Sequence, residues 1–213
     1  MATGNSQKID SAIKHAWKLI AQDYENHHLY MEGTLHCSFY HHLRQILGEE
    51  FFDKNNIRTY EEYPICVKVS KQDKAQAKRA DFAVVKLENN KDGRILDKVK
   101  SVLAIVEFKY GGNHLGSDRV ANPRSCYREI DKTVGYICHA VERERMERCK
   151  YYLGFILERG YFDYEPWLCE KKWKKHDDKR EAIVVLSAHA HKDDLTMSFW
   201  IENENQSDKN SLL

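Results

Sequence analysis

The sequence predicts an α/β (α+β) protein in which a central mixed sheet is flanked by helices. Apolar residues recur at helical spacing up to residue 47, at the strand spacing of two between residues 57 and 110, and again at helical spacing from residue 127. Further short apolar segments follow towards the C-terminus. Helical and strand segments in this order are typical of a sheet that is covered by helices.

Length and composition indicate a single domain that spans residues 1–213. Apolar residues make up 42% of the chain, which is enough for a core, and 34 Lys and Arg nearly balance 33 Asp and Glu. A net charge of +1 excludes a globally basic nucleic-acid coat but leaves room for a local basic surface. The chain has no apolar run of about eighteen residues, and its first residues are too polar for a signal peptide. We therefore expect a cytoplasmic protein without a membrane partner.

Two helices are predicted before the first strand. The first lies within residues 1–28, and the second spans roughly 29–47. In the second helix, Glu32 lies seven residues before Phe39 and therefore at the N-terminal end of the same apolar stripe. Thr34 leaves another interpretation open, in which it is the N-cap of a shorter helix.

The rest of the chain predicts three strands, then a helix, then three further strands. Pro64 lies in the first strand, and because proline cannot donate a hydrogen bond to a ladder, it indicates an edge position. The expected strands are 57–69, 81–87, 101–110, 151–157, 183–187 and 195–201, and the expected helix is 127–141.

Two charged residues interrupt the most apolar of these strands. Glu107 and Lys109 lie two positions apart in VLAIVEFKY, so their side chains leave the same face, roughly 7 Å apart. If the preceding strand pairs antiparallel to it with Leu87 opposite Ser101, then Asp81 lies opposite Glu107 on that face. The same register places Val85 opposite Leu103 and Ala83 opposite Ile105.

The expected convergence of Asp81, Glu107 and Lys109 indicates a catalytic metal site. Two close carboxylates form a hard oxygen site that suits Mg²⁺ or Mn²⁺. The ammonium group beside them is placed to orient an attacking water or to balance charge on a phosphate. Such triplets also occur by chance, and this leaves another interpretation open, in which Glu107 and Lys109 form an ion pair and Asp81 caps a turn.

Asp81 followed by Glu107-Phe108-Lys109 on an apolar strand resembles the PD-(D/E)xK nuclease superfamily, the restriction-endonuclease-like group. The core of that family is a helix, three strands, a helix and a further strand, and the expected elements from 29 to 158 come in this order. The resemblance implies a restriction-endonuclease-like α-β-β-β-α-β core and a magnesium-dependent endonuclease that hydrolyses phosphodiester bonds, of DNA rather than RNA. A defence, restriction or repair role is consistent with it.

The resemblance also implies roles for individual residues. Asp81 and Glu107 would hold Mg²⁺ or Mn²⁺ together with the backbone carbonyl of Phe108, and Lys109 would position the nucleophilic water. Glu32 matches the metal-binding glutamate that many members carry in the helix before the sheet. A helix-end carboxylate favoured by the dipole is the alternative for Glu32. Members that cut both strands are often dimers, so the resemblance favours a homodimer.

The sequence departs from the family pattern at two places. Ala80 stands where many members have a proline, and the helix after the site lacks the Gln-xxx-Tyr motif of RecB-type members. These departures leave the subfamily and the substrate open. Four polar residues of that helix receive no role from the sequence: Tyr127, Glu129, Asp131 and Lys132.

Three segments lie outside the core that the resemblance places at 29–158. We expect an N-terminal helical elaboration at 1–28, a basic arm with additional strands at 159–201 and a disordered tail at 202–213. The arm suits contacts with phosphates and stacking on an exposed base, although a solvated charged loop is the alternative. Its predicted nucleic-acid-binding residues are Lys171, Lys172, Trp173, Lys174 and Lys175.

Two other functions stay open. The fold can serve as a non-catalytic module that binds nucleic acid or protein, although the three charges on one strand pair argue against this. An RNA-directed nuclease is the other alternative, because nothing in the residues separates RNA from DNA.

Overall fold

The structure, a computed structural model, describes residues 4–29, 31–70, 74–89, 93–111, 123–158, 176–191 and 196–202. The helices are α1 (Gly4–Glu25), α2 (Glu32–Leu47), α3 (Glu49–Asn55) and α4 (Pro123–His139). The strands are β1 (Ile57–Val67), β2 (Gln76–Leu87), β3 (Val99–Gly111), β4 (Lys150–Glu158), β5 (Ile183–His191) and β6 (Thr196–Glu202). Within the described residues, no helix has the length and apolar character needed to cross a membrane.

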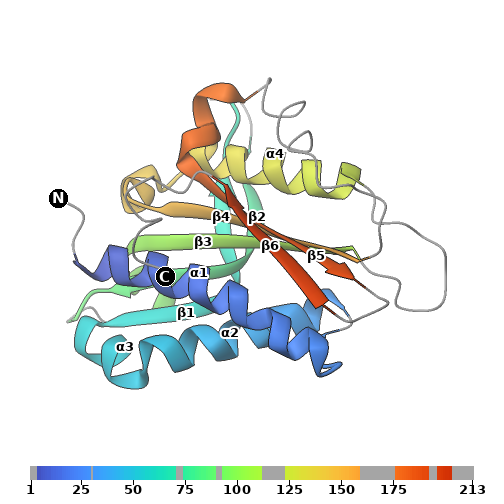
Figure 1. Ribbon diagram of the computed structural model, residues 1–213. Helices are drawn as coiled ribbons and strands as arrows, with labels where there is room; N and C mark the ends of the chain where they lie inside the picture. The colour runs from blue at the N-terminus through green and yellow to red at the C-terminus, as the bar shows by residue number, and fades with distance from the viewer. Residues whose placement is uncertain are drawn as a thin grey trace.

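The predicted α/β class with a mixed sheet is confirmed (Figure 1). Within the part of the chain that the structure describes, six strands form one sheet in the order in which they occur along the chain, from β1 to β6. β3, β4 and β5 run parallel to one another, whereas β1–β2, β2–β3 and β5–β6 pair antiparallel. The helix, three strands, helix and further strand expected between residues 29 and 158 are present in that order, with α3 in addition.

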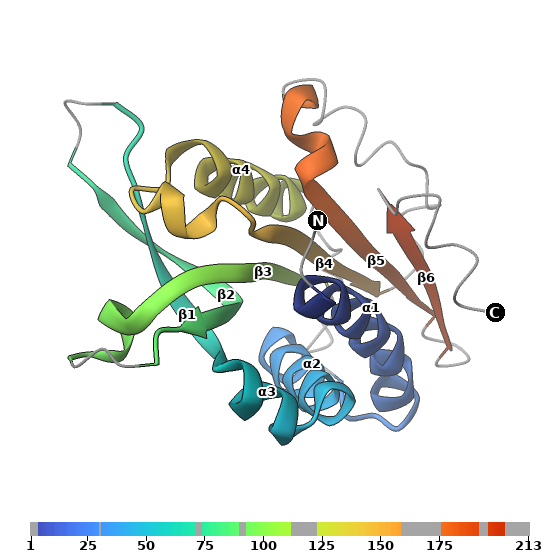
Figure 2. The same cartoon turned by 90° about the vertical axis from the view of Figure 1, so that its left-hand side faces the viewer.

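The sheet separates two hydrophobic cores, and Figure 2 shows helices on both sides of it. α1, α2 and α3 cover one face, and α4 covers the other. β3 lies between them, with Val106 and Phe108 in the first core and Ile105 in the second, each at most 1% exposed. Burial on both faces explains why this strand is apolar almost throughout. The charged residue Glu107 is an exception to this pattern.

Most predicted elements are present, but several of their limits differ. β2 begins at Gln76, five residues before the expected start, and α4 begins at Pro123 rather than Tyr127. β1, which contains Pro64, is an edge strand as predicted. The short helix α3 was not predicted, because Gly48, with a φ of +74°, ends α2 and a new helix of seven residues follows at once.

The start of α2 differs from the interpretation in which Thr34 is the N-cap. Met31 occupies the N-cap position, and Thr34 lies at the third position of the helix. The Thr34 hydroxyl donates to the Met31 carbonyl at 2.7 Å and accepts from the Met31 N–H at 3.1 Å. This reciprocal pair satisfies backbone groups at the helix start, and it places Glu32 in the first turn.

The register between β2 and β3 is partly as predicted. Ala83 pairs with Ile105, but Val85 pairs with Val102 rather than Leu103. Leu87 pairs with Val99 rather than Ser101, as the register shifts at two places. Each shift is a bulge in which β3 carries an extra residue, and the pattern of side chains does not reveal bulges in advance. The register is regular from Val84 towards Asp81, so the error does not reach the charged residues.

The end of β1 is tied to the end of α4. Val67 forms an isolated antiparallel bridge with Ala140. The N–H of Lys68 donates to the His139 carbonyl, and the N–H of Val141 donates to the Cys66 carbonyl, both at 2.8 Å. These bonds fix the C-terminal end of α4 against the β1–β2 hairpin and thereby hold the helix over this face of the sheet.

Two parts of the predictions lie outside the described residues. These are the five predicted nucleic-acid-binding residues of the arm, 171–175, and residues 203–213 of the predicted tail. The first residue of that tail, Glu202, is the last residue of β6.

A glycine on β4 allows two aromatic rings to pack beneath the charged end of β3. The rings of Trp17 and Phe108 stack at an interplanar angle of 13°, and a Cβ atom added to Gly154 would lie 2.8 Å from Trp17 and 2.7 Å from Phe108. Phe108 is thus locked in the core between the two charged residues that flank it in sequence. Close packing of this ring fixes the backbone direction at Glu107 and Lys109.

We expect Gly154→Ala to destabilise the protein by about 1–3 kcal/mol, because the added methyl group forces Trp17 or Phe108 out of place. The measurement is the free energy of unfolding from urea denaturation. Gly135→Ala in α4 is the matched control, since an added Cβ meets nothing within 4 Å there. This control should gain about 0.5–1 kcal/mol from the better helix propensity of alanine. Equal effects of the two substitutions would contradict the packing argument.

Candidate active site

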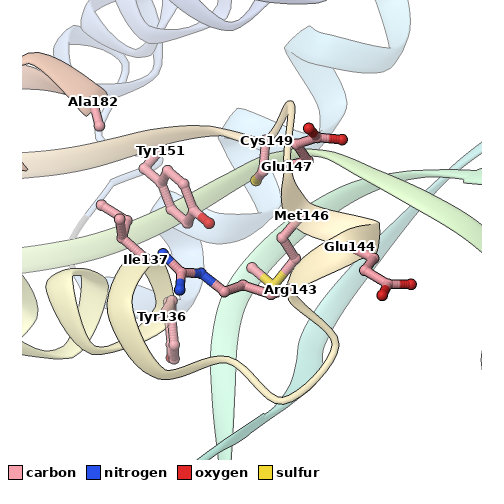
Figure 3. Close-up of a pocket in the computed structure, with 9 residues that line it drawn as sticks. All are labelled: Tyr136, Ile137, Arg143, Glu144, Met146, Glu147, Cys149, Tyr151 and Ala182. Atoms are coloured by element: carbon pink, nitrogen blue, oxygen red, sulfur yellow. The ribbon is translucent and has the colours of Figure 1, made fainter.

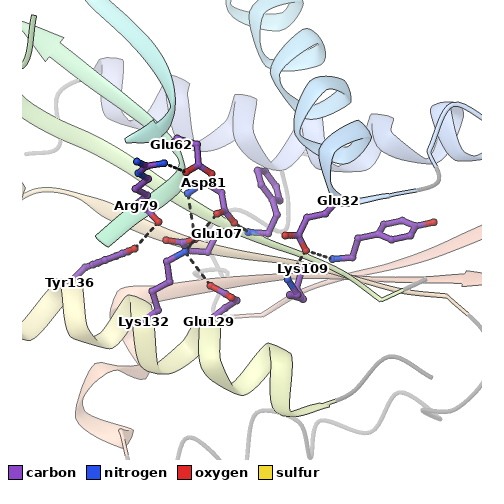
Figure 4. A network of polar contacts seen from close by, with 11 residues as sticks. Glu32, Glu62, Arg79, Asp81, Glu107, Lys109, Glu129, Lys132 and Tyr136 are labelled. Atoms are coloured by element: carbon purple, nitrogen blue, oxygen red, sulfur yellow. Dashed lines mark hydrogen bonds and ion pairs between the residues drawn. The ribbon is translucent and has the colours of Figure 1, made fainter. Parts of the chain in front are cut away.

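Asp81 and Glu107 lie at the point where β2 and β3 separate (Figure 4). The last pair between these strands is Phe82 with Val106, one residue before the two carboxylates. The N–H of Asp81 lies 3.4 Å from Oε2 of Glu107 and donates to it. The two acidic side chains therefore share one end of the strand pair.

Beyond this point, carboxylates replace β2 as hydrogen-bond partners of β3. The N–H of Phe108 donates to Oδ2 of Asp81 at 2.7 Å, and the N–H of Tyr110 donates to Oε2 of Glu32 at 3.3 Å. A strand residue presents its N–H and C=O to the same side, so the Phe108 carbonyl faces this edge as well. The first turn of α2 thus brings Glu32 to the edge of β3 from the other face of the sheet.

Lys109 pairs with Glu32. Its Nζ lies 2.7 Å from Oε2 of Glu32, and the two side chains are 30% and 37% exposed. Burial alone would lower the pKa of Lys109, but the hydrogen bond and charge of Glu32 outweigh it, so the pKa is raised. The ammonium group therefore stays charged at neutral pH. The alternative interpretation, an ion pair between Glu107 and Lys109, is wrong, because Lys109 pairs with Glu32 and Glu107 pairs with a lysine of α4.

That lysine is Lys132, and its ammonium group joins three carboxylates (Figure 4). Nζ lies 2.6 Å from Oε2 of Glu107, 3.4 Å from Oε2 of Glu129 and 3.6 Å from Oδ1 of Asp81. Burial lowers the pKa of Lys132, but the charges of Glu107, Asp81 and Glu129 and the hydrogen bond to Glu107 together outweigh burial and raise the pKa overall. The position beside both predicted metal ligands, expected for Lys109, is thus held by Lys132.

Glu107 is fully buried, at 0% exposure. Burial, and then the nearby charge of Asp81, raise the pKa of Glu107 above the usual value for a glutamate, against the opposing effect of Lys132. Oε1 of Glu107 is buried and has no hydrogen-bond partner among the described residues. A buried carboxylate oxygen without a partner is costly, so the site is short of a positive charge or a donor at this atom.

Tyr136 closes the buried side of the cluster. It is 1% exposed, and its hydroxyl donates to the Arg79 carbonyl at 3.1 Å. Burial, and then the charge of Glu107, raise the pKa of this tyrosine, so that it remains a neutral donor. The Arg79 side chain turns outward to Glu62, at 3.5 Å. The carboxylate cluster is therefore walled on the α4 side.

The donor set suits a divalent cation with hard oxygen ligands. Among the described residues, no three His, Cys, Asp or Glu side chains are arranged to hold a metal ion by themselves. Magnesium does not need three, because it is usually held by one or two carboxylates, with waters and substrate phosphates as the other ligands. Asp81 and Glu107 supply two carboxylates at one strand end, and the Phe108 carbonyl faces the same edge of β3. The residues present therefore fit Mg²⁺ or Mn²⁺.

Glu129, Lys132 and Tyr136 are the site residues whose roles the sequence did not reveal. They lie at i, i+3 and i+7 on α4 and hence on one side of the helix, towards the sheet. Their spacing beside the buried Ile130 and Val134 indicates that they lie on the side of α4 that faces the sheet, and this pattern is visible in the sequence. Asp131, another polar residue of this helix, faces away and lies 2.9 Å from His176.

A cavity of about 530 Å³ lies beside the candidate site, between the end of α4 and the start of β4 (Figure 3). It meets the site at Tyr136, which lines both. Its other lining residues are Ile137, Arg143, Glu144, Met146, Glu147, Cys149, Tyr151 and Ala182. Asp81, Glu107 and Lys109 do not line it, so the predicted chemistry lies at the open strand end rather than in this cavity.

No protein-family model, no curated protein and no solved structure matches this chain. An assignment of function therefore rests on the geometry of the described residues and on the resemblance of Asp81 and Glu107-Phe108-Lys109 to a nuclease motif.

The two lysines should differ in their effect on stability. Lys109→Ala should cost less than about 1 kcal/mol, because it removes a partly exposed ion pair. Lys132→Ala should cost about 2–3 kcal/mol, since it leaves the buried Glu107 without its cation, although proton uptake by Glu107 limits the loss. Urea denaturation of both variants at pH 7 measures the difference. A larger loss for Lys109→Ala would contradict the pairing described above.

Proposed function

We propose that this protein is a metal-dependent endonuclease that hydrolyses phosphodiester bonds, with DNA as its substrate. The observation that carries the proposal is the fully buried Glu107, which has an unpartnered oxygen and shares a strand end with Asp81. The α-β-β-β-α-β order around this strand end supports a restriction-endonuclease-like core.

Asp81, Glu107 and the Phe108 carbonyl would hold Mg²⁺ or Mn²⁺. When bound, the metal would supply Lewis-acid activation of a water and stabilisation of charge on the phosphate. Asp81 is oriented for this by the Phe108 N–H, and Glu107 by the Asp81 N–H. The two backbone N–H groups therefore hold the carboxylates in a fixed orientation, which is the contribution that a rigid scaffold makes to catalysis.

Lys109 would bind the substrate as a cation. Its raised pKa makes it a poor base at neutral pH, so its proposed role is to hold an oxygen of the phosphate and to orient the attacking water by hydrogen bonding. Glu32 restrains the ammonium group at the edge of β3. This arrangement makes Glu32 a positioning residue for Lys109 in the proposed mechanism.

The β1–β2 hairpin carries exposed basic residues next to the site, of which Arg79 is paired with Glu62. Lys78 and Arg79 precede Asp81 by three and two residues, and Lys68 and Lys74 lie further out on the same hairpin. All four residues are exposed. Exposed lysines and arginine near a catalytic strand suit contacts with the phosphates of a nucleic acid and support a polynucleotide substrate.

One observation favours a second candidate, the non-catalytic interaction module. Lys132 already places a positive charge between Asp81 and Glu107 without a metal. A protein in which this ion cluster is structural would bind nucleic acid through its basic hairpin and cleave nothing. The cleavage experiment separates the two candidates.

We expect hydrolysis of DNA in Mg²⁺ or Mn²⁺ and none after chelation with EDTA. Asp81→Asn and Glu107→Gln should each lower the cleavage rate by more than about 100-fold, because each removes a ligand charge while keeping the side-chain shape. The measurement is the initial rate on single-stranded, duplex and branched DNA, with the same RNA forms in parallel. Glu50→Gln on α3, an exposed position away from the site, is the matched control.

The control should cut at the wild-type rate. Cleavage that persists in EDTA, or in both site variants, would remove the metal hypothesis. A wild type that binds DNA but cuts none of these substrates with either metal would support the interaction module.

For the hairpin, we expect the double substitution Lys74→Ala and Lys78→Ala to weaken DNA binding and to flatten its dependence on salt. Each lost phosphate contact should reduce the slope of log affinity against log salt by about 0.9 on duplex DNA. Fluorescence anisotropy between low and moderate salt measures the slope. Lys18→Ala and Lys54→Ala, exposed on the helices of the other face, form the control pair. An unchanged slope in the hairpin variant would exclude this surface.

A further inference from the structure

Lys132 contacts both of the proposed metal ligands. Its ammonium group contacts Oε2 of Glu107 at 2.6 Å and Oδ1 of Asp81 at 3.6 Å. Both carboxylates are the proposed metal ligands, and Figure 4 shows the lysine reaching them from α4. Two cations that need the same carboxylates repel each other at this distance, so full binding of one disfavours binding of the other.

The structure also provides a second position for this ammonium group. Glu129 lies one turn before Lys132 on α4, with its Oε2 at 3.4 Å from Nζ. A lysine has a flexible stem of four carbons and three donors, so a small rotation transfers it from one carboxylate to another. The Lys132 side chain is 25% exposed and so is not enclosed on every side. A shift towards Glu129 therefore keeps its charge paired.

We propose that Lys132 competes with the divalent cation for Asp81 and Glu107, and that Glu129 receives its ammonium group when the cation binds. This inference rests on the proposed function, because it assumes the same metal ligands. Without metal, Lys132 neutralises the buried carboxylates and keeps the site folded. With metal, the displaced ammonium group stays beside the site on α4.

Lys109 differs from Lys132 in the feature that matters for this competition. Its ammonium group is held by Glu32, at 2.7 Å, which is not one of the two proposed principal ligands. The two lysines carry the same charge and lie in the same site. A comparison of the same substitution at both positions therefore separates direct competition from the general effect of removing a positive charge.

The test measures Mn²⁺ binding by isothermal titration calorimetry and the melting temperature with and without Mn²⁺. Lys132→Gln should bind Mn²⁺ about tenfold tighter or more, because one charge pair at this range commonly changes the affinity of a carboxylate for another cation by that factor. It should melt lower than wild type without metal and gain more from Mn²⁺. Lys109→Gln should change the affinity by much less.

Lys132→Arg keeps the charge and guards against a variant that fails to fold. A guanidinium group binds carboxylates through two parallel hydrogen bonds, so it should compete more strongly and weaken Mn²⁺ binding. Glu129→Gln should also weaken binding in the wild type, because Lys132 loses its second position. In the Lys132→Gln background, Glu129→Gln should have little further effect, which a double-mutant cycle measures.

The outcomes separate the two proposals. If wild type binds Mn²⁺ and neither Lys132 variant changes the affinity, the competition is overturned and the metal site stands. Equal effects of the Glu129 substitution in both backgrounds would overturn its role as the receiving group. Absence of Mn²⁺ binding in all variants would remove the metal site, and with it both the competition and the proposed nuclease. Tighter binding in Lys132→Gln together with weaker binding in Lys132→Arg supports the inference.

Discussion

The burial of the Glu107 carboxylate is the constraint on which the rest of the site depends. A fully buried carboxylate is far too costly without a cation or donors, and the chain supplies these from two separate elements. The Asp81 N–H on β2 donates to it, and Lys132 on α4 pairs with it. The position of α4 over the sheet is in turn fixed by the bridge between Val67 and Ala140. The buried carboxylate on β3 thus depends on a backbone donor from β2 and on an ammonium group from α4.

Folding alone gives no reason for this arrangement. Replacing a buried ion pair with well-packed apolar residues is often neutral or stabilising, so a sheet this apolar gains little stability from Glu107. The residues on either side of Glu107 in the sequence, Val106 and Phe108, are apolar and buried, as is usual for this strand. A costly charge at the end of such a strand, beside a second carboxylate and with one oxygen unpartnered, is typical of a functional site rather than of a structural one.

The sequence predicted the sheet and the charged strand end better than it predicted the partners of the charges. A period of two along β2 and β3, with Ala83 opposite Ile105, was enough to bring Asp81 to Glu107, because pleating fixes which residues share a face. The bulges further along the ladder did not matter for the site. Helix α3 escaped prediction because it is short and follows Gly48 at once.

The partners depend on a different kind of information. Which side of α4 faces the sheet follows from packing that joins residues far apart in the chain, and Lys132 lies 25 residues beyond Glu107. Spacing on β3 suggested Lys109 as the nearest ammonium group, but a long flexible side chain goes to the carboxylate that its surroundings leave available. Glu32 reaches the edge of β3 because β2 no longer pairs with β3 there. At that edge, Glu32 forms an ion pair with Lys109. A local pattern could therefore identify Asp81 and Glu107, whose positions the backbone of two paired strands sets. It could not identify which carboxylate each lysine pairs with, because that depends on the folded neighbours.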